Sequence, residues 1–344
     1  MSGVYRVLGI ADRGEWLDLL KRMPAPDVHF EPGYLQVFRE GEPRLFVYER
    51  EAQTVIYPFI LRPVNGLPGA AGSEFFYDIT SPYGYGGPLY PPGTDQRLIN
   101  DFYACFQQFC RENNIITEFI RFHPLLRNHE LMTGLVDVAR NSTVVFVDLS
   151  KTPDEIWSGY DRSNRKNINK ARRENVSVVI DNSPGHFADF MAIYRQTLDR
   201  NNAGLFYYFP PDFFERVHCF LPGGHIYAHA WKDGRIVASE LLIYNKHYIH
   251  SFLGGTLADY FIYRPNNLLK HEIINWAKQR GIKYFVLGGG RSDDDGIFRY
   301  KSTFSRDRRG YYIGKKVHNE EIVARLTGCP SPGQKEDFFP PYRG

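Results

Sequence analysis

Strand-like and helix-like hydrophobic patterns follow one another in a clear order in the second half of the chain. A Lys232-Asp233-Gly234 turn and a reversal at Asn245-Lys246 predict three antiparallel strands, at residues 225–231, 235–244 and 247–254. Apolar residues at helical spacing then predict a helix that begins at Pro265 and is closed by Gly281. An apolar strand at residues 282–287 follows the helix.

The first half of the chain repeats this order. Three strands are expected at residues 44–50, 54–62 and 74–80. A helix from about residue 95 to 113 has one apolar face, and residues 115–122 form the strand after it. Three strands, a loop, a helix and a strand thus occur twice, which indicates duplication of one architecture.

The chain length and the helix signals between the halves predict two domains. A single hydrophobic core rarely serves a chain of 344 residues. Thr152-Pro153-Asp154-Glu155 is a strong helix-start signal after a strand at residues 143–149. We therefore expect an α+β protein with two domains, each a mixed, mostly antiparallel sheet flanked by helices. The expected boundaries are residues 1–140, 141–327 and a Pro-rich tail, 328–344, either disordered or docked through Phe338 and Phe339.

Composition and charge exclude several classes of protein. The 42 Lys and Arg against 39 Asp and Glu give a net charge of +3, so no whole-protein field favours DNA or an anionic membrane. Four cysteines without paired spacing make neither a disulfide framework nor a zinc site. Because no signal peptide and no apolar run of about eighteen residues occur, we expect a cytoplasmic protein without a transmembrane segment.

Two local clusters of cations could carry an electrostatic function. Residues 155–175 read as one helix with six cations, which is either a solvated face or a phosphate-binding ridge. Five more cations lie within residues 299–309, after Gly288-Gly289-Gly290, a run that either lets the backbone approach a ligand or forms a flexible turn. The Asp293-Asp294-Asp295 run lacks the spacing of a calcium loop, so we expect no metal site.

Four segments, read together, resemble the Fem-type acyltransferases. They are SPYGYGGP at residues 81–88, RxxRKNINKA at 162–171, RPNNLLKHEIINWAKQRG at 264–281, and GGG…DGIFRYKSTF at 288–304. Fem-type proteins are tandem GNAT-fold proteins that include peptidoglycan-bridge aminoacyltransferases. The resemblance covers roughly residues 30–318 and implies two tandem GNAT-like domains, with the donor site in the second.

The resemblance also implies roles for individual residues. Lys301 would lie close to the transferred carbonyl. Arg165, with Lys166 and Lys170 as neighbours, would handle substrate phosphates. The helix start at Arg264, Asn266 and Asn267 would lie where ordinary GNAT enzymes bind the pyrophosphate of acyl-CoA. Gly288, Gly289, Gly290 and Arg299 complete the expected substrate-binding set.

The sequence departs from both known kinds of donor site. The helix start has no glycine, and Pro265 removes one backbone amide, so an acyl-CoA pyrophosphate loop is incomplete. The inserted helical arm of many tRNA-dependent Fem proteins is also missing. The acyl donor, aminoacyl-tRNA or acyl-CoA, therefore stays open, and we expect no tightly bound cofactor.

Catalysis would require stabilisation of an oxyanion and removal of a proton from an amine. Lys301 is the candidate for the first task. Glu240, on a central strand where burial would raise its pKa, and His250 are candidates for the second, although each suits a structural role better. The aromatic segments 206–211 and 260–263 serve either core packing or substrate contacts, and the hydroxyl of Tyr260 could hold an acceptor or protonate a leaving group.

Three functions remain in play. The favoured one is acyl or aminoacyl transfer to an amine of a phosphate-linked cell-envelope or polysaccharide precursor. Its partners would be a small-molecule, lipid-linked or nucleotide-linked sugar acceptor, and tRNA if it is the donor. The alternatives are an acetyl-CoA-dependent N-acetyltransferase acting on a small amine, and a non-catalytic duplicated scaffold that binds an anionic ligand.

Overall fold

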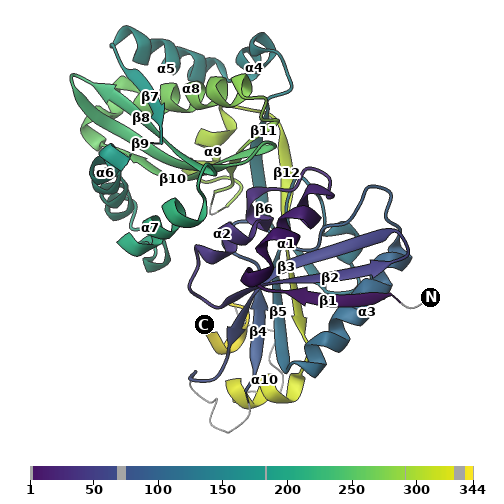
Figure 1. The fold of residues 1–344 in the computed structure, drawn as a ribbon. Coiled ribbons are helices and arrows are strands. Elements are labelled where there is room, and N and C mark those ends of the chain that lie inside the picture. The colour runs from purple at the N-terminus through teal and green to yellow at the C-terminus, as the bar shows by residue number, and fades with distance from the viewer. Residues whose placement is uncertain (1–2, 68–74, 183, 291, 329–337, 344) are drawn as a thin grey trace. The chain divides into compact units, whose positions relative to one another are not determined.

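The computed structural model describes residues 3–67, 75–182, 184–290, 292–328 and 338–343 (Figure 1). The chain divides into two compact units. Unit 1 consists of residues 1–141 and 310–344, and unit 2 of residues 142–309. Residues 310–327 therefore lie in unit 1, whereas the sequence assigned them to the second domain. No helix within the described residues is long and apolar enough to cross a membrane.

Unit 1 is a mixed sheet with the strand order β1-β2-β3-β4-β5-β12. Its strands are β1 Val4–Leu8, β2 Glu42–Arg50, β3 Gln53–Pro63, β4 Tyr77–Thr80, β5 Ile115–Arg121 and β12 Arg308–Val317. Its helices are α1 Arg13–Lys21, α2 Pro32–Gln36, α3 Gln96–Glu112 and α10 Glu320–Thr327. Among the described strands of unit 1, β4 and β5 pair in parallel and the other pairs are antiparallel, because the crossover helix α3 connects β4 to β5.

Unit 2 has the corresponding order β6-β11-β10-β9-β8-β7. Its strands are β6 Asp137–Asp148, β7 Ser177–Asp181, β8 His225–Lys232, β9 Arg235–Tyr244, β10 Tyr248–Thr256 and β11 Tyr284–Gly288. Its helices are α4 Pro153–Gly159, α5 Arg162–Arg173, α6 Phe187–Arg200, α7 Pro211–Phe220, α8 Pro265–Gln279 and α9 Gly296–Ser302. Again one pair, β10 and β11, is parallel and is connected by a crossover helix, α8.

The two units thus confirm the α+β class and the repeated order of strands and crossover helix. The two units differ in which part of the chain supplies the last strand of the sheet. The strand beside β5 is β12, from the C-terminal part of the chain, whereas the strand beside β11 is β6, which precedes the rest of unit 2. Alternation along each strand does not reveal which partner it takes, so the sequence placed the final strand with the wrong domain.

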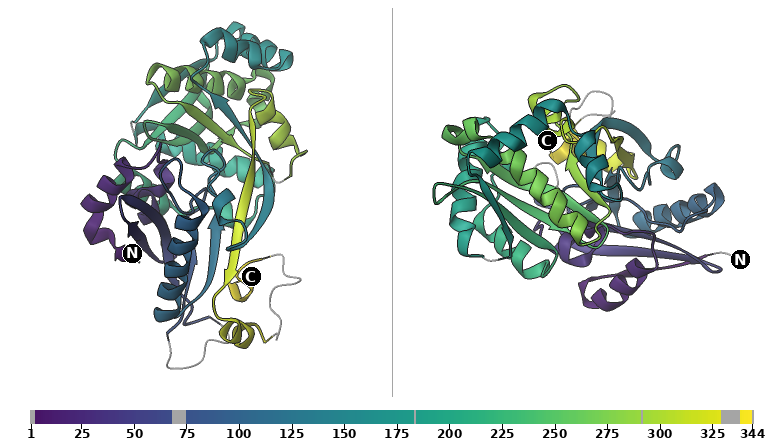
Figure 2. Two further views of the ribbon diagram at one scale, coloured as in Figure 1. Left: turned by 90° about the vertical axis from the view of Figure 1, so that its right-hand side faces the viewer. Right: turned by 90° about the horizontal axis from the view of Figure 1, so that it is seen from above.

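Helices cover both faces of each sheet. In unit 2, α5 and α8 lie on one face and α6 and α7 on the other (Figures 1 and 2). The core under α8 includes Leu268, Leu269 and Ile273, which pack against Ala238 and Leu242 of β9. In unit 1 an aromatic core lies between the sheet and α3, and α10 contributes to a smaller cluster with residues of β5 and the C-terminal segment.

The helix expected over residues 155–175 is broken into two. Thr152 and Glu155 form the expected capping box at the start of α4. The backbone of Tyr160 is extended, and α5 begins after Asp161. The basic segment is therefore a separate twelve-residue helix, α5, which packs against α8.

Candidate functional site

The first turn of α8 lacks a side-chain cap. Its N-cap residue, Arg264, has a left-handed backbone with φ of 58°, and Pro265 occupies the first helical position. Pro265 has no N–H and the N–H of Asn267 donates to the backbone oxygen of Arg264 at 3.1 Å, so the turn leaves the N–H of Asn266 and the positive end of the helix dipole available to a ligand. Such an end suits an anionic group.

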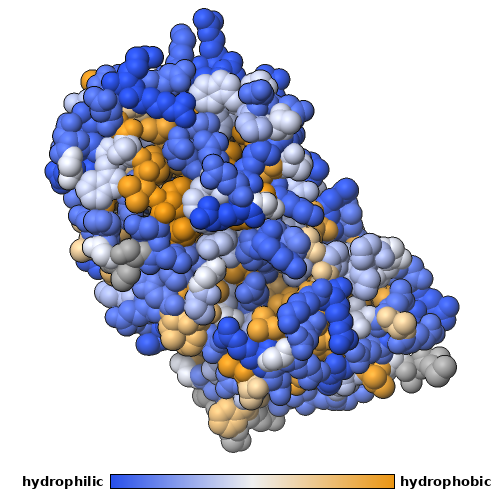
Figure 3. All heavy atoms as spheres, turned by 45° about the horizontal axis from the view of Figure 1, so that its top comes forward, coloured by the Kyte–Doolittle hydropathy of each residue, from blue (hydrophilic) through white to orange (hydrophobic). Residues whose placement is uncertain are grey.

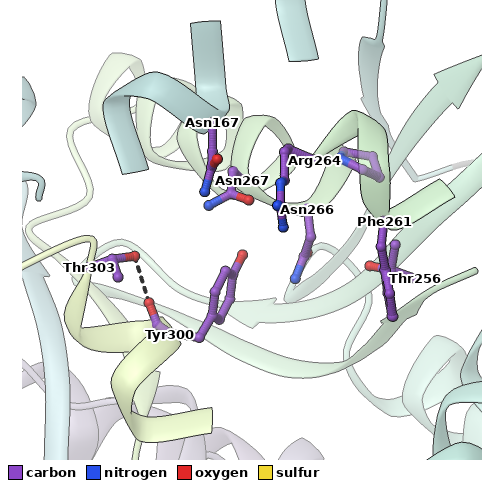
Figure 4. A pocket seen from close by; sticks show the side chains of 9 residues that line it. Asn167, Thr256, Phe261, Arg264, Asn266, Asn267, Tyr300 and Thr303 are labelled. Carbon is purple, nitrogen blue, oxygen red and sulfur yellow. Dashed lines mark hydrogen bonds between the residues drawn. The ribbon is translucent and has the colours of Figure 1, made fainter. Parts of the chain in front are cut away.

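A cavity of about 310 Å³ opens at this helix end. It lies entirely within unit 2, and α5, β10, the 3₁₀ helix η6 (Ala258–Tyr263), α8 and α9 contribute to its walls. Figure 4 shows side chains from several of these elements directed toward one space. The lining residues are Asn167, Thr256, Phe261, Arg264, Pro265, Asn266, Asn267, Tyr300 and Thr303.

A chain of amide contacts fixes the cavity walls relative to one another. The side-chain amide of Asn267 donates to Asn164 Oδ1 at 2.8 Å, and the amide of Asn164 donates to the backbone oxygen of Thr303 at 3.2 Å. Both asparagines are buried. Three helices, α5, α8 and α9, are thereby held together at the cavity. Of the residues predicted for substrate binding, Arg264, Asn266 and Asn267 line it.

Tyr300 brings a buried hydroxyl to the cavity. Its ring points toward the asparagines in Figure 4, and within the described part of the chain its hydroxyl has no hydrogen-bond partner at good geometry. Burial raises the pKa of Tyr300 well above its usual value; the charge of Glu240 adds to the rise and the amide of Asn266 opposes it. The hydroxyl is therefore a protonated hydrogen-bond donor available to a ligand.

Lys301, the next residue of α9, donates to the backbone oxygen of Gly289 at 2.6 Å. Burial, together with the positive charge of Lys270, lowers the pKa of Lys301 to about 8. The glycine run makes this contact possible, because a Cβ on Gly288 would lie 3.2 Å from the Lys301 ammonium and one on Gly289 2.7 Å from the oxygen of Thr143. The glycines thus accommodate groups of the protein itself, and they do not line the cavity.

Glu240 is part of a buried ion pair. Lys270 of α8 donates to a Glu240 carboxylate oxygen at 2.5 Å and to Ser251 Oγ at 2.5 Å. A carboxylate that is already paired with an ammonium group is poorly placed to act as a free base. The pair instead sets the electrostatic surroundings of Lys301, whose pKa Lys270 lowers and Glu240 raises.

Neither Lys301 nor Glu240 is among the cavity-lining residues, and the other two catalytic candidates also lie outside that set. His250 is buried on β10, on the opposite face from Ser251, since side chains alternate along a strand. Tyr260 packs against the small core cluster of Ile193, Ile236 and Leu257. Its neighbour Phe261 lines the cavity instead, so the aromatic segment 260–263 serves both core and cavity.

The cations predicted to bind phosphate are divided between structural and exposed positions. The guanidinium of Arg165 donates to the backbone oxygens of Ser158 at 3.1 Å and of Tyr160, so it caps the end of α4. Lys166 and Arg299 are exposed, and Lys170 is half-buried. Strongly hydrophilic side chains cover the upper edge of the molecule in Figure 3, where the top of Figure 1, including α5, comes forward.

The acidic run before α9 also has structural partners. Asp293 accepts hydrogen bonds from the backbone N–H and the hydroxyl of Thr143, both at 2.7 Å. Asp295 caps α9 by accepting from the N–H of Phe298 at 2.6 Å. These contacts secure the segment between β11 and α9, which positions Tyr300 and Lys301.

Unit 1 has no corresponding open helix end at its crossover helix. Asp95 caps α3, and its carboxylate accepts from the N–H of Leu98 at 2.8 Å. A carboxylate at this position satisfies an amide and repels an anionic ligand. Of the two crossover helices, therefore, the one in unit 2 presents the end that suits an anion.

Sequence reasoning missed several cavity residues. Tyr300 and Thr303 belong to the FRYKSTF segment, where Arg299 and Lys301 were singled out and these two residues were not. Asn164 and Asn167 lie on the face of α5 that also carries the buried Ile168 and Ala171, and this spacing could have marked them as inward-facing polar residues.

A model of a known domain family matches the part of the chain that forms the cavity. Residues 161–302 match the model of the acetyltransferase (GNAT) domain, a range that contains every cavity-lining residue except Thr303. No curated protein sequence matches the chain.

Solved structures show the fold of the whole chain. The crystal structure of FemX superimposes with a TM-score of 0.74 at 11% identity, over 93% of this chain and 99% of that chain. A tandem GNAT protein from the clavulanic acid biosynthesis pathway gives 0.53 at 12% identity, over 92% and 99%. The C-terminal domain of a putative lysylphosphatidylglycerol synthetase from Agrobacterium fabrum gives 0.52 at 16% identity, over 91% and 93%. The expected tandem GNAT fold of the Fem type is thereby confirmed.

Proposed function

We propose that this tandem GNAT-fold chain transfers an acyl or aminoacyl group to an amine and that the cavity of unit 2 holds the activated donor. The observation that carries the proposal is the open N-terminus of α8 at the cavity, beside Arg264 and three asparagines. Donors of both kinds, acyl-CoA and aminoacyl-tRNA, bring phosphates that such a helix end can bind. The capped start of α3 supports unit 2 as the donor-binding unit.

The reaction requires one bond to form and one to break. The amine nitrogen attacks the carbonyl carbon of the donor; a C–N bond forms, and the ester C–O or thioester C–S bond breaks. The amine loses a proton, and the leaving oxygen or sulfur gains one. In the proposed mechanism the ammonium of Lys301 stabilises the oxyanion. Tyr300, which remains protonated and faces the cavity, holds the donor by a hydrogen bond.

The proposed acceptor is an amine on a phosphate-linked cell-envelope or polysaccharide precursor. Support comes from the shared fold with FemX and with the domain of a lysylphosphatidylglycerol synthetase. Acetyl transfer to a small amine is the second candidate, because the family model matched by residues 161–302 is that of an acetyltransferase domain.

Donor consumption by the purified protein tests the proposal. Labelled aminoacyl-tRNA and labelled acetyl-CoA are each supplied with nucleotide-linked sugars, lipid-linked sugars or small amines that carry a free amino group, and amide product is measured by mass spectrometry. Product from aminoacyl-tRNA with a phosphate-linked acceptor supports the favoured function, and product from acetyl-CoA supports the second. Binding of a phosphate-linked sugar without turnover of either donor would identify a non-catalytic scaffold.

Two variants, Lys301→Ala and Asn266→Asp, test whether that activity depends on the proposed site. Lys301→Ala should lower turnover by orders of magnitude, because it removes a buried cation next to Tyr300, whereas Lys166→Ala removes an exposed cation and should leave turnover unchanged. Asn266→Asp places a negative charge at the start of α8 and should weaken donor binding. Unchanged donor affinity in Asn266→Asp would remove the helix end from the donor site.

A further inference from the structure

Two short helices of unit 2 expose a group of large apolar side chains. They are η5 (Leu205–Tyr207) and η6. The exposed fractions are 89% for Leu205, 55% for Phe206, 43% for Phe261 and 61% for Ile262. We call these four residues the apolar rim. Exposed apolar side chains mark interaction surfaces where they lie in one region, and both short helices contact the C-terminal half of α6.

Both helices are attached to the last turns of α6. The hydroxyl of Tyr194 donates to the backbone oxygen of Tyr207 at 2.6 Å, which fixes η5. The guanidinium of Arg200 lies 4.8 Å from the centre of the Phe261 ring and donates to the backbone oxygen of Thr256 at 3.1 Å, which fixes the start and the middle of η6. These contacts with α6 therefore hold the two short helices that carry the apolar rim.

Arginines lie beside these two helices, together with the exposed acid Asp199, which accepts a hydrogen bond from the hydroxyl of Tyr208 at 2.8 Å. Arg200 contacts Phe261, and Arg235 lies 5.9 Å from the ring centre of Tyr260. Arg264 follows η6 directly and is exposed. The exposed acid of η6 is Asp259. Protruding apolar side chains with arginines behind them are the arrangement by which proteins insert into the interface of an anionic lipid layer.

We propose that the apolar rim is a docking surface for a lipid membrane that contains anionic headgroups. The rim inserts below the headgroups, while Arg200, Arg235 and Arg264 lie at the level of the lipid phosphates. The two most exposed residues, Leu205 and Ile262, are aliphatic. Aliphatic side chains favour lipid over single-stranded nucleic acid, which binds through aromatic stacking in a cationic groove. Phe261 of the apolar rim and Arg264, which follows η6, both line the cavity, so docking would bring the cavity to the lipid surface.

Vesicle co-sedimentation of the full chain tests this proposal. Vesicles of phosphatidylcholine alone are compared with vesicles of phosphatidylcholine mixed with phosphatidylglycerol. The wild-type chain should partition to the mixed vesicles, and Leu205→Glu/Phe206→Glu should reduce partitioning by at least about tenfold, because two apolar contacts are replaced by charges. Arg235→Gln should reduce the dependence on phosphatidylglycerol and the sensitivity to salt.

The matched control is Val179→Glu, which places the same charge at another exposed apolar position of unit 2, on β7. It should partition like the wild type. Equal partitioning of Leu205→Glu/Phe206→Glu and the wild type would overturn the proposal, as would wild-type binding to a single-stranded RNA oligonucleotide but to neither kind of vesicle. Donor consumption with a water-soluble acceptor is measured in parallel. Because Leu205 and Phe206 do not line the cavity, that activity should persist, so loss of membrane binding is distinguished from failure of the proposed function.

Discussion

The ammonium group of Lys270 lies 2.5 Å from a carboxylate oxygen of Glu240 in the interior of unit 2. Both side chains are almost fully buried. Because two ions have been taken out of water, each depends on the other for compensation. The pair also lies close enough to Lys301 to influence its pKa in opposite directions.

Replacing Lys270 with Met should therefore lower the free energy of unfolding by about 3–5 kcal/mol, because the carboxylate of Glu240 would remain buried without its partner. Urea titration followed by circular dichroism measures this change. The double variant Lys270→Met/Glu240→Gln should be more stable than Lys270→Met alone. A double variant that loses the sum of the two single losses would show that the residues contribute independently.

The lowered pKa of Lys301 predicts a dependence of stability on pH. The ordinary pKa of a lysine is 10.5, and in the folded chain that of Lys301 is about 8. Between these values the unfolded chain binds more protons than the folded chain, so this residue contributes a rise in stability from about pH 8 to pH 10.5. Lys301→Met should show a smaller rise over the same window in urea titrations at several pH values. Identical pH dependence in both proteins would contradict the assigned pKa.

The same pKa predicts a pH profile for acyl transfer. If the ammonium of Lys301 stabilises the oxyanion, its contribution should fall as pH rises through about 8. Lys301→Arg keeps its positive charge throughout this range and serves as the control. The ratio of the wild-type rate to the Lys301→Arg rate should therefore decrease above pH 8. A ratio that increases would indicate that the neutral amine of Lys301 acts as a base.

Tyr300→Phe should separate ligand binding from stability. Its hydroxyl is buried and, in the described part of the chain, has no hydrogen-bond partner at good geometry, with the amide of Asn266 nearby, so its removal should change the free energy of unfolding little. Donor affinity measured by calorimetry should fall, because the hydroxyl faces the cavity. Tyr103→Phe is the matched control: its hydroxyl donates to Glu118 at 2.8 Å, so its removal should cost about 1.5–3 kcal/mol of stability. Unchanged donor affinity in Tyr300→Phe would exclude this hydroxyl from binding.

The three-strand meander, the crossover helix and the strand after it could be predicted in both units because local patterns determine them, whereas β1, β7 and β12 were not predicted. The turn at Asp233-Gly234, Pro265 at the start of α8 and Gly281 after its end are local signals, and each occurs where the sequence indicated. The assignment of β12 to unit 1 could not be predicted, because it depends on pairing with β5 across nearly 200 residues of chain. Long-range pairing of this kind has no local signature.

The candidate site likewise contains residues that the sequence could indicate and contacts that it could not. Arg264, Asn266 and Asn267 were found because they open a helix that the sequence marks clearly. The partners of Arg165 and Glu240 were not found, since a carbonyl at a helix end and an ammonium group thirty residues away leave no trace in residue spacing. Arg165 was consequently given a role toward a ligand, and Glu240 was kept as a candidate base although a structural role suited it better; each has a partner within the protein.

Arg165→Ala should therefore affect stability. It leaves the carbonyls at the end of α4 without their cationic donor, and we expect a loss of about 1–3 kcal/mol in the free energy of unfolding. Calorimetry should show unchanged affinity for inorganic pyrophosphate. Lys166→Ala, one residue away and exposed, should change neither quantity. Weaker pyrophosphate binding by Arg165→Ala at unchanged stability would instead restore the phosphate-binding interpretation.

The C-terminal segment should stabilise unit 1 through Asp78. This carboxylate is fully buried and accepts from Arg62 at 2.6 Å and from Arg343 at 2.5 Å. Tyr342 is buried beside it, with its hydroxyl 2.6 Å from Thr117 Oγ1. Of the two residues named for a docked tail, Phe339 has its ring centre 6.1 Å from that of Phe119, whereas Phe338 is exposed.

Arg343→Ala should lower the free energy of unfolding of unit 1 by about 1.5–3 kcal/mol, because it removes a hydrogen bond between charged groups from a carboxylate that stays buried. Urea titration should show the loss, and the fluorescence of Trp16, which is buried in unit 1, reports on that unit. Arg343→Lys, which keeps the positive charge but lacks the second donor to Pro63, should recover part of the loss. An unchanged unfolding transition in Arg343→Ala would mean that Arg62 alone satisfies Asp78.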